Sequence, residues 1–403
     1  MAFQSLGPNQ PSVEISVDFA NDPTSSTRTW VDITTYVRQF TITRGRKDAL
    51  SRPEVGTLSL TLQNDSGRFD PTNTAGAYSP NVLPMRRVRV LAQWNSVTYN
   101  LFHGHIEDWP LSFPNDGKNA LVGVRAVDAL AVLNLFDLAG KSYAAQVADV
   151  RGSAVLVDCG FGTAEMNLRT GQSTMVASGT ISSQTAQSMI LDVSASENGL
   201  WFVNAGGTWV FQDRHFRQTQ KSATSGTVGT QGGQIGYRDI RTTYGAQDLA
   251  NIIKVTASGG TTETTTDASS TATYYQRTIT WPVSGTYLVS SQAEALAAAQ
   301  YIKAIYSTPA LRIPEVVAVP AGATANWPTV LAAELSDRLT IRHVRPDGGT
   351  ITGDKHLEGI GHAASFERDW AVTLSLSDAD AQAFWILGDA NLSLLGDTTI
   401  LGY

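Results

Sequence analysis

A stretch near the N-terminus, SRPEVGTLSLTLQNDSGRFDP at residues 51–71, alternates strictly between apolar and polar side chains and then stops. Leu58, Leu60 and Leu62 share one face, whereas Thr, Ser and Gln side chains share the other. Because successive side chains of a β-strand point to opposite faces, this pattern predicts a half-buried strand. The residues NDSG follow at once and predict a turn, since Asn, Asp and Gly tolerate positive φ. The continuation RFDPTN is neither a second strand nor a helix start, so the strand presents an irregular loop.

Similar alternation recurs often enough to predict a mainly β chain. It occurs at residues 13–19, 30–44, 57–63, 86–90, 101–109 and 122–126. Short strands separated by Pro, Gly and Asn turns are typical of a small β-barrel or sandwich, which we expect over residues 1–128. The composition agrees, because only 16% of the residues are charged, against roughly 25% in an ordinary globular chain. The length of 403 residues predicts about two to four domains.

The apolar period changes after Asp128, which predicts a small α/β middle domain and a linker over residues 129–230. Asp128 can cap a short helix, and a second helix is expected over residues 185–198. Two apolar runs within residues 200–212 are joined by Ala-Gly-Gly, which indicates a β-hairpin. The residues 221–233 are rich in Ser, Thr, Gly and Gln and predict a loose connection.

Residues 231–377 are predicted to form a second β-barrel domain that contains one helix. The sequence SQAE at residues 291–294 is a capping box, so a helix is expected over about residues 291–307. Strands are expected again between residues 311 and 376. The Thr- and Ser-rich residues 258–273 predict an exposed hairpin tip or a mobile loop.

Two three-part stretches resemble each other and indicate an internal duplication. The early one reads RRVRVLAQWN, LFHGHIEDW and LVGVRAVDA, and the late one reads DRLTIRHVRP, HLEGIGHAA and WAVTLSLSDAD. Each has a basic strand, a strand with a Gly/His step and an alternating strand that closes on Asp. We therefore predict a mainly β fold with two tube-like β-barrel domains related by duplication, an α/β middle domain and a short apolar C-terminal tail over residues 378–403.

Motifs that carry chemistry are scarce. His103 and His105 lie on one face of a predicted strand, and Glu107 and Asp108 follow them. Such a group can bind a divalent cation, but polar side chains along a hairpin edge are the interpretation we favour, so no metal site is expected. The sequence has no serine-hydrolase elbow and no HExxH motif. A glycosidase needs only two carboxylates, yet acidic residues beside turns are usually solvated. We expect no catalytic residues and no cofactor.

Charge and cysteine content exclude several classes of protein. The formal net charge of −7 argues against tight wrapping of DNA, because duplex affinity comes from basic side chains that neutralise phosphates. Cys159 is the single cysteine, so an intrachain disulfide is excluded. The sequence predicts neither a signal peptide nor a membrane-spanning segment, and we expect the chain to be made in the cytoplasm. The nine tryptophans mostly fall in strand patterns, where they pack cores or subunit contacts, with sugar stacking as the alternative.

Residues 30–90, WVDITTYVRQFTITRGRKDALSRPEVGTLSLTLQNDSGRFDPTNTAGAYSPNVLPMRRVRV, resemble the N-terminal region of phage minor tail proteins. These are the hub, or tail-associated, proteins of long-tailed phages, especially the phages of actinobacteria. The specific parts are TRGR, the alternating strand, NDSGRFDP and NVLPMRRVR. Weaker likeness is found in FHGHIEDW, in ENGLWFVNAGGTWVFQDRHF and in the closing FWILGDANLSLLGDTTILGY.

The resemblance implies a non-enzymatic virion protein at the tail tip. In this family three copies form a pseudo-sixfold ring that continues the tail tube, lines the DNA path without specific binding and adapts to threefold tip components. The implied partners are the distal tail protein or tail tube, the tape measure protein and downstream tail-tip or fibre proteins. The candidate assembly contacts are Arg68, Phe69, Asp70, Trp385, Leu387, Leu394 and Leu395. The alternatives are a hexameric distal tail protein and a glycan- or receptor-binding tip protein.

Overall fold

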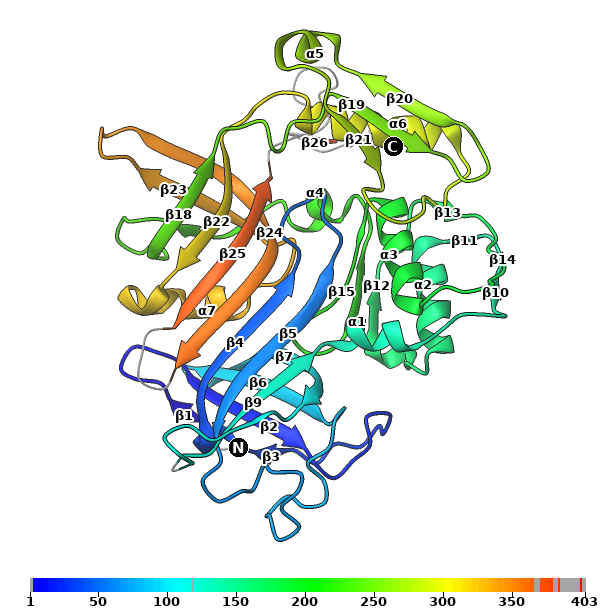
Figure 1. Ribbon diagram of the computed structural model, residues 1–403. Helices are drawn as coiled ribbons and strands as arrows, with labels where there is room; N and C mark the ends of the chain where they lie inside the picture. Colours follow the sequence, from blue (N-terminus) through cyan, green and yellow to red (C-terminus); the bar gives the residue numbers. More distant parts are fainter. Residues whose placement is uncertain (1–2, 118, 366–369, 380–382, 385–398, 401–403) are drawn as a thin grey trace.

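A computed structural model describes residues 3–117, 119–365, 370–379, 383–384 and 399–400 (Figure 1). The protein is mainly β, and most strands belong to one 15-stranded sheet. Its first part, here called the first sheet region, contains β1 (Gln4–Ser5), β2 (Ser12–Asp18), β3 (Val31–Asp32), β4 (Val37–Gly45), β5 (Glu54–Gln63), β6 (Arg87–Trp94), β7 (Val97–Asp108), β8 (Leu111–Ser112) and β9 (Leu121–Val127). The second sheet region contains β17 (Thr224–Val228), β18 (Tyr237–Thr243), β22 (Arg312–Ala318), β23 (Arg338–Val344), β24 (Thr350–Ser365) and β25 (Ala371–Asp378).

The alternating patterns of the N-terminal part form strands as predicted. In β5 the leucines at positions 58, 60 and 62 are buried, while Thr57, Ser59 and Gln63 are exposed. β5 is hydrogen-bonded to β4 on one edge and to β9 on the other. Its apolar face covers the core, as is common for strands of antiparallel sheets. The alternation therefore determined both the strand and the face that it buries.

The two sheet regions follow the same strand order. The first runs β2-β6-β7-β9-β5-β4 across the sheet, and the second runs β17-β23-β24-β25-β22-β18. Both paths also use their strands in the same order along the chain. The regions differ at one end, where β2 is antiparallel to β6 but β17 is parallel to β23.

The register of the strands agrees between the two regions. Arg87 lies opposite His105 in the first region, and Arg338 lies opposite His356 in the second. A bulge follows soon after in both, on β7 between Ile106 and Asp108 and on β24 between Leu357 and Gly359. The two meanders β6-β7-β9 and β23-β24-β25 therefore agree in register around these positions, although β6 and β7 have a further bulge, between Val90 and Leu91, that β23 and β24 lack. An origin of this likeness in a duplication stays a prediction from the sequence.

An unusual backbone conformation also occurs at matching places. Met85 and Ser336, each two residues before its basic strand residue, have positive φ values of 62° and 73°. The N–H of Met85 donates to the carbonyl of Ile106 at 2.6 Å, and the N–H of Ser336 donates to the carbonyl of Leu357 at 2.8 Å. Non-glycine residues rarely adopt this conformation, so its occurrence at both positions reflects a shared strand framework.

The structure corrects the prediction of two closed barrels. Within the described residues the sheet path is open, and it runs from β1 to β18 without returning on itself. The reason is that β4, the last strand of the first region, pairs along its outer edge with β24 of the second region. In Figure 1 these two strands lie side by side in the middle of the molecule. We call the β4–β24 pairing the seam.

Aromatic side chains join the two sheet regions beneath the seam. The rings of Phe40 and Trp370 are 5.7 Å apart, those of Trp370 and Trp327 are 5.4 Å apart, and those of Trp327 and Trp94 are 6.3 Å apart. Trp327 begins helix α7 (Trp327–Leu331), and its indole N–H donates to the carbonyl of Asn9 at 2.8 Å. One continuous hydrophobic core therefore serves both regions.

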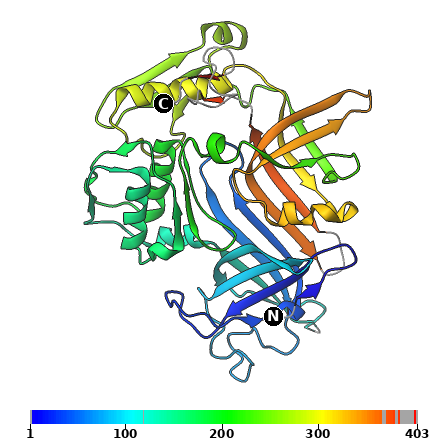
Figure 2. The ribbon, with the colours of Figure 1, turned by 180° about the vertical axis from the view of Figure 1, so that it is seen from behind.

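A second core belongs to a mixed lobe built from residues 129–212 and 250–306. Its helices are α1 (Ala129–Val132), α2 (Ala148–Asp158), α3 (Ala186–Glu197), α5 (Ala268–Tyr274) and α6 (Gln292–Tyr306), and α4 (Phe216–Gln220) lies between lobe and sheet. Its strands are β10 (Ser142–Tyr143), β11 (Gln146–Val147), β12 (Met166–Leu168), β13 (Thr174–Met175), β14 (Gly179–Thr180), β15 (Leu200–Val203), β16 (Trp209–Gln212), β19 (Ile252–Thr256), β20 (Thr262–Thr266) and β21 (Thr278–Trp281). A short parallel pair, β26 (Ala383–Phe384) and β27 (Thr399–Ile400), completes the described strands. Figure 2 shows the lobe from behind, beside and above the sheet.

The predicted helices form where capping residues are present. Thr185 accepts from the N–H of Ser188 at the start of α3, and Ser291 accepts from the N–H of Glu294 at the start of α6. The position of α6 differs from the prediction, however. It was expected within the second barrel, but its buried face, which includes Ile302, packs in the core of the mixed lobe. The connection between β18 and β22 leaves the sheet region to form part of that lobe, because its own apolar residues are covered there.

Candidate functional site

A buried charged cluster lies at the top of the seam, where three parts of the chain meet. Glu358 of β24 is fully buried and accepts from Arg46, which follows β4, at 2.8 Å. It also accepts two hydrogen bonds from Arg217 of α4, at 2.5 and 2.9 Å, and one from Ser377 of β25. Burial alone would raise the pKa of Glu358, but the two arginines outweigh it and hold that pKa well below its ordinary value.

A second ion pair lies at the seam, between Arg44 and Glu334. Arg44 of β4 donates to both carboxylate oxygens of Glu334, at 2.9 and 3.1 Å. The backbone N–H of Ala205, in the β15–β16 turn, donates to the same carboxylate at 3.1 Å. The neighbouring Gly207 packs against the ring of His103 on β7. The hairpin of the mixed lobe is thus held between the two sheet regions, and these contacts fix the relative positions of all three parts.

The loop that follows β5 packs inward. Phe69 is fully buried, and its ring lies 5.5 Å from Tyr36 and 6.1 Å from Trp109. Arg68 covers the Tyr36 ring at 4.0 Å, and Asp70 accepts from the N–H of Thr72 at 2.8 Å. Phe69 was expected to contact a neighbouring subunit. Its side chain instead fills the chain's own core, because a large aromatic ring is stabilised by burial beside other rings. A contact role for Arg68 and Asp70 stays a prediction.

The remaining candidate contacts belong to the C-terminal tail. Trp385, Leu387, Leu394 and Leu395 lie outside the residues that the structure describes. Their role in assembly stays a prediction from the sequence.

The surroundings of His103 and His105 are cationic. Burial, together with the positive charges of Arg87 and Arg28, lowers the pKa of His103 to about 4 and that of His105 to about 3. Arg89 also contributes to the low pKa of His103. The His103 ring packs edge-on against Trp30 at 5.7 Å. Both histidines are therefore neutral, and the arginines make the position unfavourable for a divalent cation.

The acidic residues considered from the sequence do not converge. Asp65 accepts from the side chain of Gln63 and from the N–H of Ala120, while Glu107 and Asp108 are exposed. Among the described residues, no group of three or more His, Cys, Asp or Glu side chains could hold a metal ion. These carboxylates serve as turn and surface groups.

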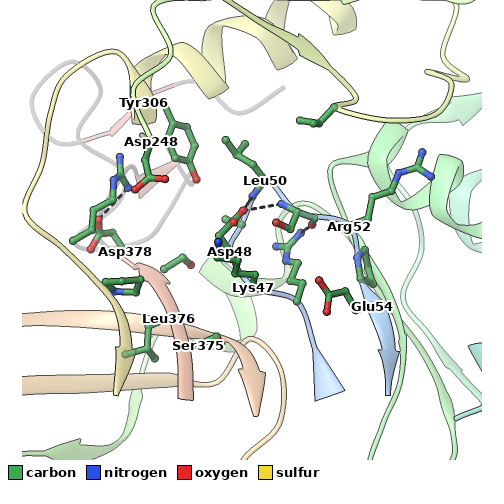
Figure 3. A pocket seen from close by; sticks show the side chains of 18 of the residues that line it. Lys47, Asp48, Leu50, Arg52, Glu54, Asp248, Tyr306, Ser375, Leu376 and Asp378 are labelled. Carbon is green, nitrogen blue, oxygen red and sulfur yellow. Dashed lines mark hydrogen bonds and ion pairs between the residues drawn. The ribbon is translucent and has the colours of Figure 1, made fainter. Parts of the chain in front are cut away.

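A cleft of about 750 Å³ lies between the seam and the mixed lobe. Figure 3 shows the β4–β5 connection on one side, with Lys47, Asp48 and Arg52, and the end of β25 with Asp378 on the other. Tyr306, at the end of α6, closes the cleft from above.

The chemistry of this cleft is that of a domain junction. Its lining contains five basic and five acidic side chains, so it has no excess of either charge. Several are already paired, with Arg52 2.6 Å from Asp192, Arg312 3.3 Å from Asp378 and Arg241 3.2 Å from Glu315. Such mutual neutralisation is expected where segments must stay together, whereas a substrate site leaves polar groups free to bind.

The sequence analysis missed the central residues of this junction. Arg46 and Glu358 lie in segments that it quoted, TRGRK and HLEGIGHAA, but only as likeness to a family or as part of a repeat. A signal was present in the second segment, where Glu358 is the one acidic residue of HLEGIGHAA. Arg217 lies far away in the sequence, in a stretch without any pattern that would link it to Glu358.

Comparisons with known proteins show likeness in fold. No protein-family model matches this chain, and no curated protein matches it in sequence. Among solved structures, the 43 kDa tail protein of prophage MuSo2 from Shewanella oneidensis is 13% identical with a TM-score of 0.59, and the match covers 92% of this chain and 98% of that one. A tail protein from Neisseria meningitidis MC58 is 10% identical with a TM-score of 0.59, over 90% and 96% of the two chains. A chain of the Francisella PdpA-VgrG complex is 10% identical with a TM-score of 0.50, over 91% of this chain and 58% of its own length.

The fold is therefore that of phage tail proteins over nearly the whole chain. Among the described helices, none combines the length and the apolar character needed to span a bilayer.

Proposed function

We propose that this chain is a structural protein of a phage tail tip, a baseplate hub of the type found in phages of actinobacteria, in which three copies form a pseudo-sixfold ring. The observation that carries the proposal is the repeated strand order, in which six strands of each sheet region follow one path with matching register and bulges. Such a repeat is what an internal duplication leaves behind. Three chains that each contribute two similar regions would present six similar units to a sixfold tail tube.

The fold likeness supports the tail assignment independently of the sequence resemblance. Two tail proteins share the fold over at least nine tenths of this chain. The buried ion pairs at the seam support a rigid role, because a wall of fixed geometry needs its two sheet regions held at one angle. A ring of this kind would continue the tail tube, contact the distal tail protein and the tape measure protein, and present its opposite face to downstream tip or fibre proteins.

The charge of the chain fits a DNA path without specific binding. A net charge of −7 per chain repels phosphates weakly, so DNA would slide through the lumen rather than adhere to it. We place the protein in the virion at the tail tip, after assembly in the host cytoplasm, and assign it no enzymatic activity. Purified protein should release nothing above background from peptidoglycan or from host surface polysaccharide, and turnover abolished by one Asp or Glu substitution would contradict this assignment.

A reconstruction of the intact tail tip tests the proposal most directly. Three copies of the chain per ring, with the two sheet regions in alternating positions, are the expected result. Six copies per ring would contradict the hub assignment and favour a hexameric distal tail protein instead. A location outside the tube axis would favour a glycan- or receptor-binding tip protein.

A further inference from the structure

The two sheet regions differ most at matching strands, β4 and β18. Both carry a bulge near their start, between Val37 and Gln39 in β4 and between Tyr237 and Asp239 in β18. β4 is hydrogen-bonded on both edges, to β5 and to β24. β18 is hydrogen-bonded only to β22 among the described strands, so its outer edge is open.

The open edge exposes residues that are buried in the matching strand. Phe40, Ile42 and Arg44 of the first region are buried. Alignment on the first bulge places Ile240, Thr242 and Tyr244 at the corresponding positions, and the second bulge comes two residues earlier in β18 than in β4. Ile240 is only half-buried, Thr242 is exposed, and the Tyr244 side chain is 71% exposed. An unpaired strand with an exposed aromatic residue is a template for pairing with another chain.

In the first sheet region, β8 is the counterpart of the C-terminal half of β24, and one edge of β8 is also unpaired among the described strands. The C-terminal half of β24 pairs with β25 on one side, with His362 opposite Val372, and with β4 on the other. In the first region β8 pairs with β9, with Leu111 opposite Val122, but no described strand occupies its other side. The next residue after β8, Phe113, is 58% exposed.

We propose that the open edge of β18 in one copy pairs antiparallel with the open edge of residues 109–114 in a second copy of this chain, as β4 pairs with β24 within one chain. The register follows from the seam, in which Thr41 lies opposite Ala363 and Phe40 lies opposite Ala364. The matching pairs across two copies are Arg241 with Ser112, and Ile240 with Phe113. Because the two edges belong to different surfaces, the contact is head-to-tail and can close into a ring.

The proline in the receiving segment does not obstruct this pairing. The carbonyl of Pro110 accepts from the N–H of Gly123 at 3.0 Å, so the backbone of Pro110 faces β9. In an extended strand the N and C=O of one residue point to the same side. The missing N–H of Pro110 therefore lies on the side that is already paired, and Trp109 and Leu111 turn their backbone groups toward the open edge.

This inference rests on the proposed ring, and cysteine cross-linking can test the two separately. We would change the buried Cys159 to Ser, so that no native thiol reacts, and introduce Arg241→Cys together with Ser112→Cys. A short bis-maleimide should then link separate chains and yield covalent products up to the trimer. The matched pair Thr41→Cys with Ala363→Cys, at the equivalent positions of the seam, should cross-link within one chain, which then stays a monomer on denaturing gels.

The controls and outcomes distinguish the proposed edge pairing between copies from the proposed ring. Each single variant, and the pair Arg241→Cys with Val97→Cys at the far end of β7, should give at least tenfold less trimer on denaturing gels. A trimer in light scattering without the Arg241–Ser112 cross-link would overturn the proposed edge pairing and leave the ring intact. A product that stops at the dimer would overturn the head-to-tail arrangement. A chain that stays monomeric and uncross-linked at high concentration would overturn both the edge pairing and the ring.

Discussion

The two sheet regions share a strand framework but differ wherever a connection leaves it. β4 and β5 are joined by the short residues 46–53, whereas the equivalent β18 and β22 are joined by residues 244–311, which form part of the mixed lobe. The edge of β4 is buried in the seam, and the edge of β18 is open. Alternation and bulges therefore maintain the framework, since both are present in the two regions although the connecting loops differ greatly. Interactions between regions are set by the connections and by single charged residues.

One pair of equivalent glutamates illustrates how a single position separates the two regions. Glu358 and Glu107 both lie in the bulge of the long central strand. Glu358 is buried against Arg46 and Arg217, whereas Glu107 is exposed. The difference arises because β4 and α4 cover the bulge of β24, while the matching surface of β7 is open.

Glu358→Gln should have the largest effect on the free energy of unfolding. The substitution leaves two buried guanidinium groups without their counter-ion, and breaking a buried ion pair typically costs about 3–5 kcal/mol. Glu107→Gln is the matched control and should change the free energy of unfolding by no more than about 0.5 kcal/mol, as exposed substitutions do. Urea titrations of both variants measure the difference. Equal losses would mean that the seam does not depend on the buried cluster.

Asp128→Asn should remove a pH dependence that Asp128 gives to the first region. Asp128 ends β9 and is buried, and burial raises its pKa to about 7 although the N–H groups of Gly56 and Leu130 donate to it. The folded chain then holds a proton that the unfolded chain releases near pH 4. Protonated Asp128 therefore stabilises the folded chain fully below a pH of about 4, and this stabilisation is lost as the pH rises through about 7. Its size is about 1.4 kcal/mol for each unit by which the folded and unfolded pKa values differ.

Urea titrations of the unsubstituted chain and of Asp128→Asn between pH 4 and pH 8 measure this decline as the difference between the two chains. The difference isolates Asp128, because the buried histidines, whose pKa values are lowered, change stability in the same window with the opposite sign and do so in both chains. Relative to the Asn variant, which has no titrating group at this position, the unsubstituted chain should lose a few kcal/mol across the window. Asp378→Asn, at the equivalent end of β25, should leave the decline in place, because Asp378 is ion-paired with Lys355 and Arg312. A difference between the unsubstituted chain and Asp128→Asn that does not change with pH would contradict the prediction.

Gly45→Ala should destabilise the fold while Gly245→Ala should not. Gly45 has φ of +101°, and a Cβ there would come within 2.3 Å of the Glu358 carbonyl oxygen. The strained backbone alone costs on the order of 1–3 kcal/mol. Gly245, just after β18, has open space around it, so its change should stay within about 0.5 kcal/mol for the isolated chain.

Deletion of residues 386–403 should have the smallest effect on folding. The first region continues from Asp128 into a helix, whereas the second continues from Asp378 into an apolar tail with Ile386, Leu387, Leu392, Leu394, Leu395, Ile400 and Leu401. Apolar residues at such density are typical of a docking segment. The truncated chain should keep its unfolding midpoint, yet particles that carry it should lose the components below the hub. Normal infectious particles would contradict a docking role.

Local patterns predicted most strands and the capped helices, but some elements had no readable signal. α2 contains Gly152 at a position where a Cβ would come within 2.2 Å of Trp201, and the adjacent Arg151 is buried. A glycine and a buried arginine hide the apolar period of a helix. β17 lies in residues 221–233, which are rich in Ser, Thr and Gly, and it forms because β23 offers an edge to pair with.

The repeat could be detected because it is carried by residues close together in sequence. RRVRV and DRLTI lie at equivalent places, since Arg87 is opposite His105 and Arg338 is opposite His356. That a duplication produced them stays a prediction. The mainly β character and the faces of the strands follow from the sequence alone, because a strand's side chains alternate regardless of what surrounds it. Only the tertiary structure decided that β4 pairs with β24, that Phe69 turns inward and that Glu358 meets Arg46 and Arg217. Those contacts join residues far apart in the chain, so their energies depend on burial and geometry that exist only once the regions have packed together.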